Sequence, residues 1–246
     1  MTPSYQKGFT IIETMLFLGI TGLLVMGILV GTGAAINIQR YRDSVSSLKS
    51  VLQQQYTNVS NVSNSRTSSW VCDNNGQVIE SDSGGIPRGQ SDCVILGKFI
   101  TTIDNQNLVV RDVVGSTSEK TVPSNDLEAL QKYNLRVSSV DFSGENYRLD
   151  WGSTLAVPES GANATFSILI LKSPASGAVR TFIDPSSVVA DNSVGNLVSA
   201  TALGSSLRVC VDSQGMFGGG QAAIFIVPGA TGPSGVETLG EATSGC

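Results

Sequence analysis

The chain has 246 residues, of which 41% are hydrophobic and 14% charged, and its formal net charge is −5. This composition excludes a disordered chain and suits one ordinary globular domain with an appendage. The 15 Lys and Arg side chains are scattered, so the sequence offers no basic stripe for nucleic acid. Histidine is absent, which removes the commonest general base and the commonest metal ligand and argues against an enzyme.

A long apolar segment lies near the N-terminus. Residues 9–36 contain one ionisable side chain, that of Glu13. As a helix they would span roughly 42 Å, whereas the hydrocarbon core of a bilayer is about 30 Å thick. The segment is too long for the apolar region of a signal peptide, and it predicts a membrane-spanning helix. Its five glycines favour either close helix–helix contact or only the usual glycine content of such helices: Gly19, Gly22, Gly27, Gly31 and Gly33.

The helical pattern continues beyond the apolar segment. Apolar residues recur at spacings of three and four, which places them on one helix face: Tyr41, Val45, Leu48, Leu52, Tyr56 and Val59. The polar residues between them, including 53–55, are expected to face water. Residues 9–60 therefore predict one helix, membrane-spanning over 9–36 and amphipathic over 37–60, which ends in the polar residues 58–69.

Residues 61–246 predict a β-rich globular domain. Turn residues separate eight apolar runs, each of which predicts a strand: 93–103, 107–114, 135–142, 146–151, 165–172, 179–184, 207–212 and 222–227. Ser124 is expected to cap a short helix, and Trp70 and Trp151 are expected in the core rather than in a ligand site. The fold class is therefore α+β, with a long helix laid on an antiparallel sheet.

Four cysteines, Cys72, Cys93, Cys210 and Cys246, occur without the close pairs typical of zinc sites. Two disulfides are favoured over four reduced thiols, because a chain end has little reason to carry a buried thiol. Three pairings are possible, and we choose Cys72–Cys93 with Cys210–Cys246 because they close the shorter loops. Such bonds indicate an oxidising compartment. No metal or cofactor is predicted, and the segment 73–80 is expected to be a turn rather than a calcium loop.

Glu13 poses a problem of charge in an apolar helix. A carboxylate at the bilayer centre costs roughly 2.5–3.5 kcal/mol, and less near the end of a span, so Glu13 needs a partner. No Lys or Arg lies within one turn on its C-terminal side, and Lys7 lies on another face. A new amino group at Phe9 could pair with Glu13 of the same chain or with that of a neighbouring copy.

The motif KGFTIIE at 7–13, followed by the long apolar helix, resembles the processing site and first helix of type IV pilins and type II secretion pseudopilins. The resemblance covers about positions 1–60. It implies that residues 1–8 are a leader peptide, charged at Lys7, which a prepilin peptidase removes by cutting between Gly8 and Phe9 and then methylating Phe9. It also implies that Glu13 pairs with the terminal amine of an adjacent subunit as a filament grows.

The resemblance carries further expectations. It implies a pilin fold, other pilin subunits and an inner-membrane assembly platform as partners, and membrane lipid around the helix. Before assembly the chain would be a single-pass protein of the cytoplasmic membrane with residues 61–246 outside, and afterwards part of an extracellular pilus or periplasmic pseudopilus. The size of the chain favours a minor pilin or pseudopilin that supports adhesion, twitching motility or uptake. The disulfide-bounded C-terminal region would lie on the filament surface, or would be a pinned loop without a partner.

Two features depart from the family pattern, and they keep an alternative open. Residues 9–36 lack the proline that many major pilins carry, and basic residues flank the apolar segment on both sides, so their distribution does not set its orientation. Outward placement of the head thus depends on the leader and the cysteines. The alternative is a membrane-anchored extracytoplasmic adhesin or binding domain that never polymerises. An anchored enzyme is disfavoured by the missing histidine and catalytic motifs.

Overall fold

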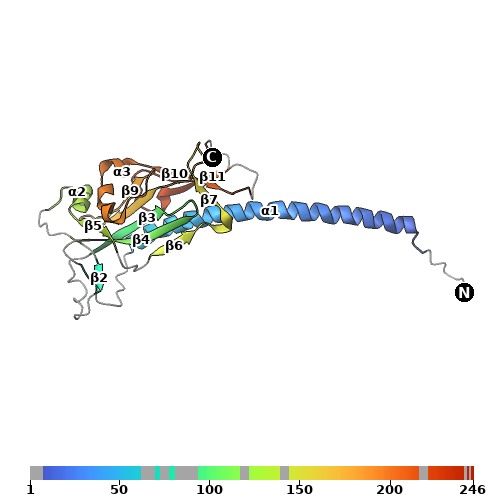
Figure 1. Ribbon diagram of the computed structural model, residues 1–246, viewed down its shortest axis with the longest axis horizontal. Helices are drawn as coiled ribbons and strands as arrows, with labels where there is room; N and C mark the ends of the chain where they lie inside the picture. The colour runs from blue at the N-terminus through green and yellow to red at the C-terminus, as the bar shows by residue number, and fades with distance from the viewer. Residues whose placement is uncertain are drawn as a thin grey trace.

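The fold is α+β, with one long N-terminal helix and antiparallel sheets. The computed structural model describes residues 8–61, 70–72, 78–80, 94–116, 122–138, 144–215, 221–240, 243 and 245–246. In Figure 1 the β-rich head lies along the C-terminal part of helix α1, and the N-terminal part of α1 extends away from the head by itself. The C-terminus lies near the place where α1 leaves the head.

Helix α1, Ile11–Ser60, is continuous and about 75 Å long. The six residues of the predicted stripe are all buried, because their spacing of three and four places them on the face that contacts the head. Ser44 and Gln55 are buried as well. The expectation that Gln55 faces water is wrong: its amide donates hydrogen bonds to Val51 O and to Glu145 Oε2, both at 3.3 Å. These bonds offset the loss of water around the amide.

Two main sheets form the head, where the sequence predicted one. The six-stranded sheet has the order β5-β4-β3-β8-β9, and β6 also pairs with β4. Its strands are β3 Val94–Thr102, β4 Asn107–Ser116, β5 Asn134–Val137, β6 Glu145–Arg148, β8 Ser167–Lys172 and β9 Val179–Asp184. The four-stranded sheet has the order β12-β11-β10-β7. Its strands are β7 Thr154–Ala156, β10 Leu207–Asp212, β11 Ala222–Ile226 and β12 Val236–Leu239.

Each of the eight predicted runs contains a strand, and the described residues hold four further short ones. These are β7 and β12, together with β1 Trp70–Cys72 and β2 Val78–Glu80, which pair with each other. The remaining elements are short helices: α2 Asp126–Gln131, α3 Ala200–Gly204, and the 3-10 turns η1 Asp150–Gly152, η2 Asp191–Leu197 and η3 Pro233–Gly235.

The six-stranded sheet is buried on both faces, which gives the head two cores. One core joins the stripe of α1 to the four-stranded sheet and to side chains such as Ile100, Ile168 and Ile170. The other lies under α2, η2 and α3, where Phe99 and Phe182 fill its centre. Because alternate residues of one strand point to opposite faces, neighbours in β3 and β8 enter different cores. This explains the continuous apolar run of β8, which is typical of a strand covered on both sides.

Hydrogen bonds join the C-terminal end of α1 to the six-stranded sheet. Tyr56 is buried, and its hydroxyl accepts a hydrogen bond from Thr181 of β9 at 3.1 Å. Burial raises the pKa of Tyr56 to about 12, although the bond from Thr181 acts in the opposite direction. Lys172 Nζ donates to the carbonyl of Ser60 at 2.9 Å, which places a cation on the last carbonyls of the helix.

A buried ion pair lies within the six-stranded sheet. Lys98 of β3 and Asp112 of β4 are cross-strand partners, and Lys98 Nζ lies 2.8 Å from Asp112 Oδ1. Both side chains are at most 5% exposed. Sequence analysis did not single out either residue. Removing one partner of such a pair is costlier than replacing both with apolar groups, because the remaining charge stays buried.

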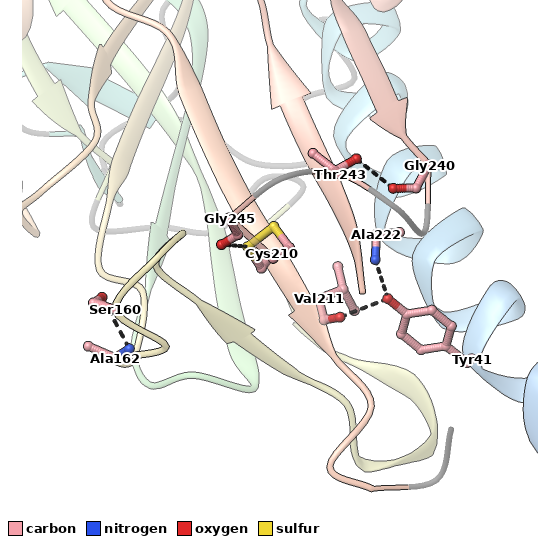
Figure 2. Close-up of a disulfide and its surroundings, with 10 residues drawn as sticks. Tyr41, Ser160, Ala162, Cys210, Val211, Ala222, Gly240, Thr243 and Gly245 are labelled. Atoms are coloured by element: carbon pink, nitrogen blue, oxygen red, sulfur yellow. Dashed lines mark hydrogen bonds between the residues drawn. A yellow bond between two sulfur atoms is a disulfide. The ribbon is translucent and has the colours of Figure 1, made fainter. Parts of the chain in front are cut away.

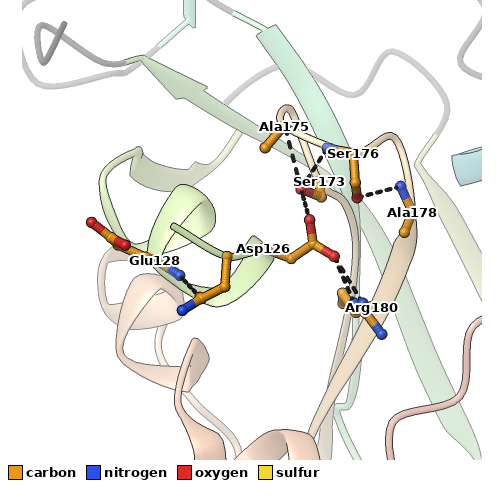
Figure 3. Close-up of polar contacts among 8 residues, drawn as sticks. Asp126, Glu128, Ser173, Ala175, Ser176, Ala178 and Arg180 are labelled. Carbon is orange, nitrogen blue, oxygen red and sulfur yellow. Dashed lines mark hydrogen bonds and ion pairs between the residues drawn. The ribbon is translucent and has the colours of Figure 1, made fainter. Parts of the chain in front are cut away.

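Helix α2 is held to the edge of the six-stranded sheet by a polar cluster around Asp126. Asn125 is the N-cap, so the expectation for Ser124 is wrong; Ser124 instead donates both its backbone N–H and its hydroxyl to Glu128. Asp126 accepts from Ser173 at 2.7 Å and from Arg180 of β9 at 2.8 Å (Figure 3).

The same contacts lower the pKa values of two carboxyl groups. Hydrogen bonds from Ser176, Ser173 and Arg180 lower the pKa of Asp126 from 3.8 to about 2. Hydrogen bonds from the Ser124 side chain and backbone, with a further one from Lys132, lower the pKa of Glu128 from 4.5 to about 2. Both carboxylates therefore stabilise the folded state above their unfolded pKa values, and this stability is lost as the pH falls toward 2.

We expect the free energy of unfolding to fall between about pH 4.5 and pH 2, and Asp126→Asn to remove part of this slope. The variant should be less stable than the parent at pH 7, and the gap should close as the pH falls through about 2, where Asp126 becomes protonated. Chemical unfolding of the detergent-solubilised chain across this range measures the difference. A gap that is equally wide at pH 2 would contradict an electrostatic origin.

Gly97 lies at a bulge in β3, where the register with β4 shifts between Ile95 and Gly97. A Cβ atom at this position would lie 1.9 Å from the carbonyl oxygen of Ile170 in β8. The neighbouring strand therefore approaches so closely that only glycine fits, and the clash involves backbone that cannot rotate away.

Gly97→Ala is expected to destabilise the head by roughly 3 kcal/mol, since β3 or β8 must shift to admit the methyl group. The matched control is Gly204→Ala at the end of α3, where a Cβ meets nothing within 4 Å, and its effect should stay within about 0.5 kcal/mol. Thermal unfolding of both variants in detergent makes the comparison. Equal stability of the two variants would be inconsistent with the close approach of β8.

Candidate functional site

The N-terminal end of α1 is capped by a local hydrogen bond. Thr10 has extended backbone angles, and its hydroxyl oxygen accepts from the backbone N–H of Glu13 at 3.3 Å. The carbonyl of Thr10 accepts from the N–H groups of Glu13 and Thr14. Thr10 is therefore the N-cap and Glu13 the third helical residue. Sequence analysis missed this role, although the spacing T-x-x-E at 10–13 is the known signature of a capping box.

Glu13 is exposed, and its side chain is the only ionisable one in residues 9–36. In a complete capping box it would return a hydrogen bond to the N–H of Thr10. Among the described residues, the Glu13 carboxylate makes no such hydrogen bond and contacts no cation. The side-chain cap is made by the hydroxyl of Thr10 alone. The positive end of the helix dipole favours a carboxylate here by about 0.3–1 kcal/mol, which is less than the cost of placing the charge in lipid.

The residues of the predicted processing site lie at the exposed end of α1. Phe9 is 81% exposed and directly precedes the N-cap, and Gly8 is exposed before it. Lys7 and the rest of the predicted leader lie outside the described residues. Phe9 and Glu13 are separated by one turn of chain, so an amine formed at Phe9 and the carboxylate would belong to the same end of the same helix.

No described part of the chain covers the apolar half of α1. Its large apolar side chains from Phe9 to Ile36 are exposed, and α1 is the described helix that is long and apolar enough to cross a membrane. The threonine hydroxyls in this half donate to carbonyls three or four residues earlier in the same helix: Thr14, Thr21 and Thr32. Their polarity is thus satisfied inside the helix, as an apolar environment requires. Glu13 is left as the charged group in an otherwise apolar rod.

The C-terminal end of the head contains a disulfide between Cys210 and Cys246 (Figure 2). The pair is the one chosen from the sequence, and its Cα atoms lie 5.6 Å apart. Cys210 is in the middle of β10 and buried, so the bond fixes the C-terminal residue against the four-stranded sheet. For the other expected pair, Cys72 belongs to β1 but its side chain is not described, and Cys93 lies outside the described residues.

Tyr41 ties α1 to the same sheet beside the disulfide (Figure 2). Its buried hydroxyl donates to the carbonyl of Val211 at 2.9 Å and accepts from the N–H of Ala222 at 2.5 Å. Val211 and Ala222 are cross-strand partners in β10 and β11, so the hydroxyl bridges one rung of the sheet. The helix is therefore hydrogen-bonded to one sheet through Tyr41 and to the other through Tyr56.

Within the described part of the chain, no group of three or more Cys, Asp or Glu side chains is placed to hold a metal ion. The segment 73–80, where a turn is expected, is described only over its last residues, which form β2.

Comparison with known proteins yields no match to this chain among family models, curated proteins or solved structures.

Cys246→Ser should lower the free energy of unfolding by about 3–4 kcal/mol, because the lost bond closes a loop with a sequence separation of 36. Chemical unfolding without reductant measures this change, and mass spectrometry without reduction checks the linked peptides. Adding Cys210→Ala to Cys246→Ser provides the control, since the bond is already absent and the further effect should be small. Unchanged stability in the single variant would refute a stabilising bond.

Proposed function

We propose that the chain is a structural subunit of a filament of the type IV pilus class, either a minor pilin or a pseudopilin. It is made with the leader 1–8, cut between Gly8 and Phe9, methylated at Phe9 and assembled through α1. The head forms the outer shell of the filament and α1 enters its core. The packing of a half-bare helix on a β-rich domain supports the proposal, because it is the layout that the resemblance of residues 1–60 implies.

The observation that carries this proposal is the state of Glu13. The carboxylate of Glu13 is exposed at the start of a bare apolar helix. The hydroxyl of Thr10 caps this end of the helix, so the carboxylate is not needed for capping. The charge is therefore available to an outside partner. In an apolar surrounding an unpaired carboxylate is penalised, and a pair with an amine is strongly favoured over it.

The proposed partner is the new amine of Phe9 in a neighbouring copy. Each processed subunit carries one such amine and one Glu13 carboxylate at the same end of α1. When neighbouring copies are displaced along the helix axis, the amine of one copy can pair with the carboxylate of the next. A copy that enters at the wrong depth would leave both charges in the apolar core without partners. The pair thus sets the registry of the bundle, and the bare apolar surface of α1 supplies the contact area.

The alternative function is a membrane-anchored extracytoplasmic adhesin or binding domain that stays a monomer. Such a domain needs the same apolar helix, but it needs neither a new terminus at Phe9 nor a charge at Glu13. N-terminal sequencing in cells that contain a prepilin peptidase separates the two functions. The proposal expects a terminus at methylated Phe9, and recovery of intact Met1 would favour the anchored monomer.

Glu13→Ala is expected to leave cleavage after Gly8 intact and to reduce incorporation into filaments by at least about tenfold, since a lost charge pair in an apolar setting is worth more than 1.4 kcal/mol. Immunoblots of sheared filaments and of membranes measure the two outcomes. Glu237→Gln on the exposed part of β12 is the matched control and should assemble normally. Normal filament entry of Glu13→Ala would rule out the registry role.

A further inference from the structure

Trp151 is the exposed aromatic residue of the head among those described, contrary to the expectation that it lies in the core. It is 52% exposed and sits in η1, which contacts α1. Its φ angle is +58°, and Gly152 follows with φ +74°. A left-handed backbone is costly for a bulky aromatic residue, so the fold holds this side chain at the surface against a local preference.

The indole of Trp151 is covered in part by Arg40 of α1. The guanidinium carbon of Arg40 lies 4.8 Å from the ring centroid, which is a cation–π contact. A guanidinium stacked in this way keeps N–H donors along its edge, and these suit the oxygens of a phosphate group. Arg40 and Trp151, here called the Arg40–Trp151 pair, thus offer an amphipathic ring and phosphate donors at one point on the surface.

The position of the pair along α1 matches the boundary of a bilayer. Arg40 follows Ile36, the last exposed apolar residue of the bare half, by one helical turn. If residues 9–36 are centred in the membrane, the Cα of Arg40 lies about 26 Å from the midplane, and the headgroup layer ends at about 20–22 Å. Helical side chains tilt toward the N-terminus, which here is toward the bilayer, so the guanidinium reaches the headgroups.

We propose that the Arg40–Trp151 pair is an interfacial anchor that binds the phosphate groups of phospholipids on the head side of the membrane. Tryptophan and arginine are the residue types favoured at this depth. Asp43 and Asp150 lie close in sequence to Arg40 and Trp151 and offset the charges of Arg40 and Arg42, so the ligand is the phosphate shared by all phospholipids rather than an anionic lipid alone. The inference depends on α1 crossing the membrane, and not on cleavage or filament assembly.

The test places the full chain in phosphatidylcholine vesicles that carry a nitroxide either on the headgroup or in the middle of the acyl chain. Trp70→Phe leaves Trp151 as the single tryptophan. We expect its fluorescence to be quenched about twofold more strongly by the headgroup label than by the acyl label, because indole prefers the interface. Replacing part of the phosphatidylcholine with phosphatidylglycerol should change this ratio little.

Two variants of α1 separate the anchor from general charge attraction. Arg40→Gln should reduce the headgroup quenching at least about twofold, whereas Lys49→Gln removes the same charge about 13 Å farther from the bilayer and should leave it unchanged. If Trp70→Phe fails to fold, the difference between the parent chain and Trp151→Phe gives the quenching of Trp151 instead. Arg40→Lys keeps the charge but lacks the planar fork of N–H donors that stacks on Trp151, so it should restore only part of the quenching.

Each remaining outcome overturns the inference. Absence of headgroup quenching in chains that float with vesicles after an alkaline wash would show that α1 is anchored and the pair is not, which leaves the proposed function intact. Quenching that falls as the protein-to-lipid ratio rises would show that a second copy, rather than lipid, covers the pair. Chains that do not float would remove the membrane span on which both proposals depend.

Discussion

The bare apolar half of α1 is the constraint on which the rest of the structure depends. A helix of this composition cannot stay in water, and the head covers only the face from Tyr41 to Val59. Because no described part of the chain covers residues 9–36, we expect lipid or other helices to surround them. Both environments are apolar, and both impose the same condition on the backbone and on the threonine hydroxyls, which are satisfied within the helix. The carboxylate of Glu13 is the polar group that is not satisfied within the helix. Whether it pairs with another copy therefore distinguishes a passive anchor from an assembling subunit.

The head is built to hold the other half of this helix rigidly. Its six-stranded sheet is covered on both faces, so α1 packs on a layer that is itself supported from behind by α2, η2 and α3. The buried pair of Lys98 and Asp112 and the close approach at Gly97 fix the registry of β3 with its two neighbours. The tyrosine hydroxyls add directional bonds at both ends of the apolar stripe. The orientation of the helix relative to both sheets is thus set by hydrogen bonds as well as by apolar packing.

Much of this fold could be predicted from local pattern. The spacing of the stripe gave the buried face of α1, and eight strands followed from apolar runs between turn residues. What could not be predicted depends on long-range contacts. Gln55 is polar and was assigned to solvent, but Glu145, far along the chain, provides its partner. The short strands β7 and β12 gain their hydrogen bonds from β10 and β11, and their sequences carry little periodicity. Trp151 is displayed by a left-handed backbone that composition does not reveal. At the candidate site, the sequence pattern singled out Glu13 and Phe9, whose roles stay predictions, whereas it could have indicated the cap at Thr10 only through the spacing T-x-x-E.

The bridge made by Tyr41 has a mechanical consequence. A pull along α1 enters the head through its first buried hydrogen bonds, which are those of the Tyr41 hydroxyl to Val211 and Ala222. The force is divided at once between two hydrogen-bonded strands, and one residue away Cys210 passes it through a covalent link to the chain end. Tension along α1 is therefore shared by the Tyr41 hydrogen bonds, two paired strands and the disulfide before it reaches the rest of the four-stranded sheet. These contacts must break before α1 can separate from the head.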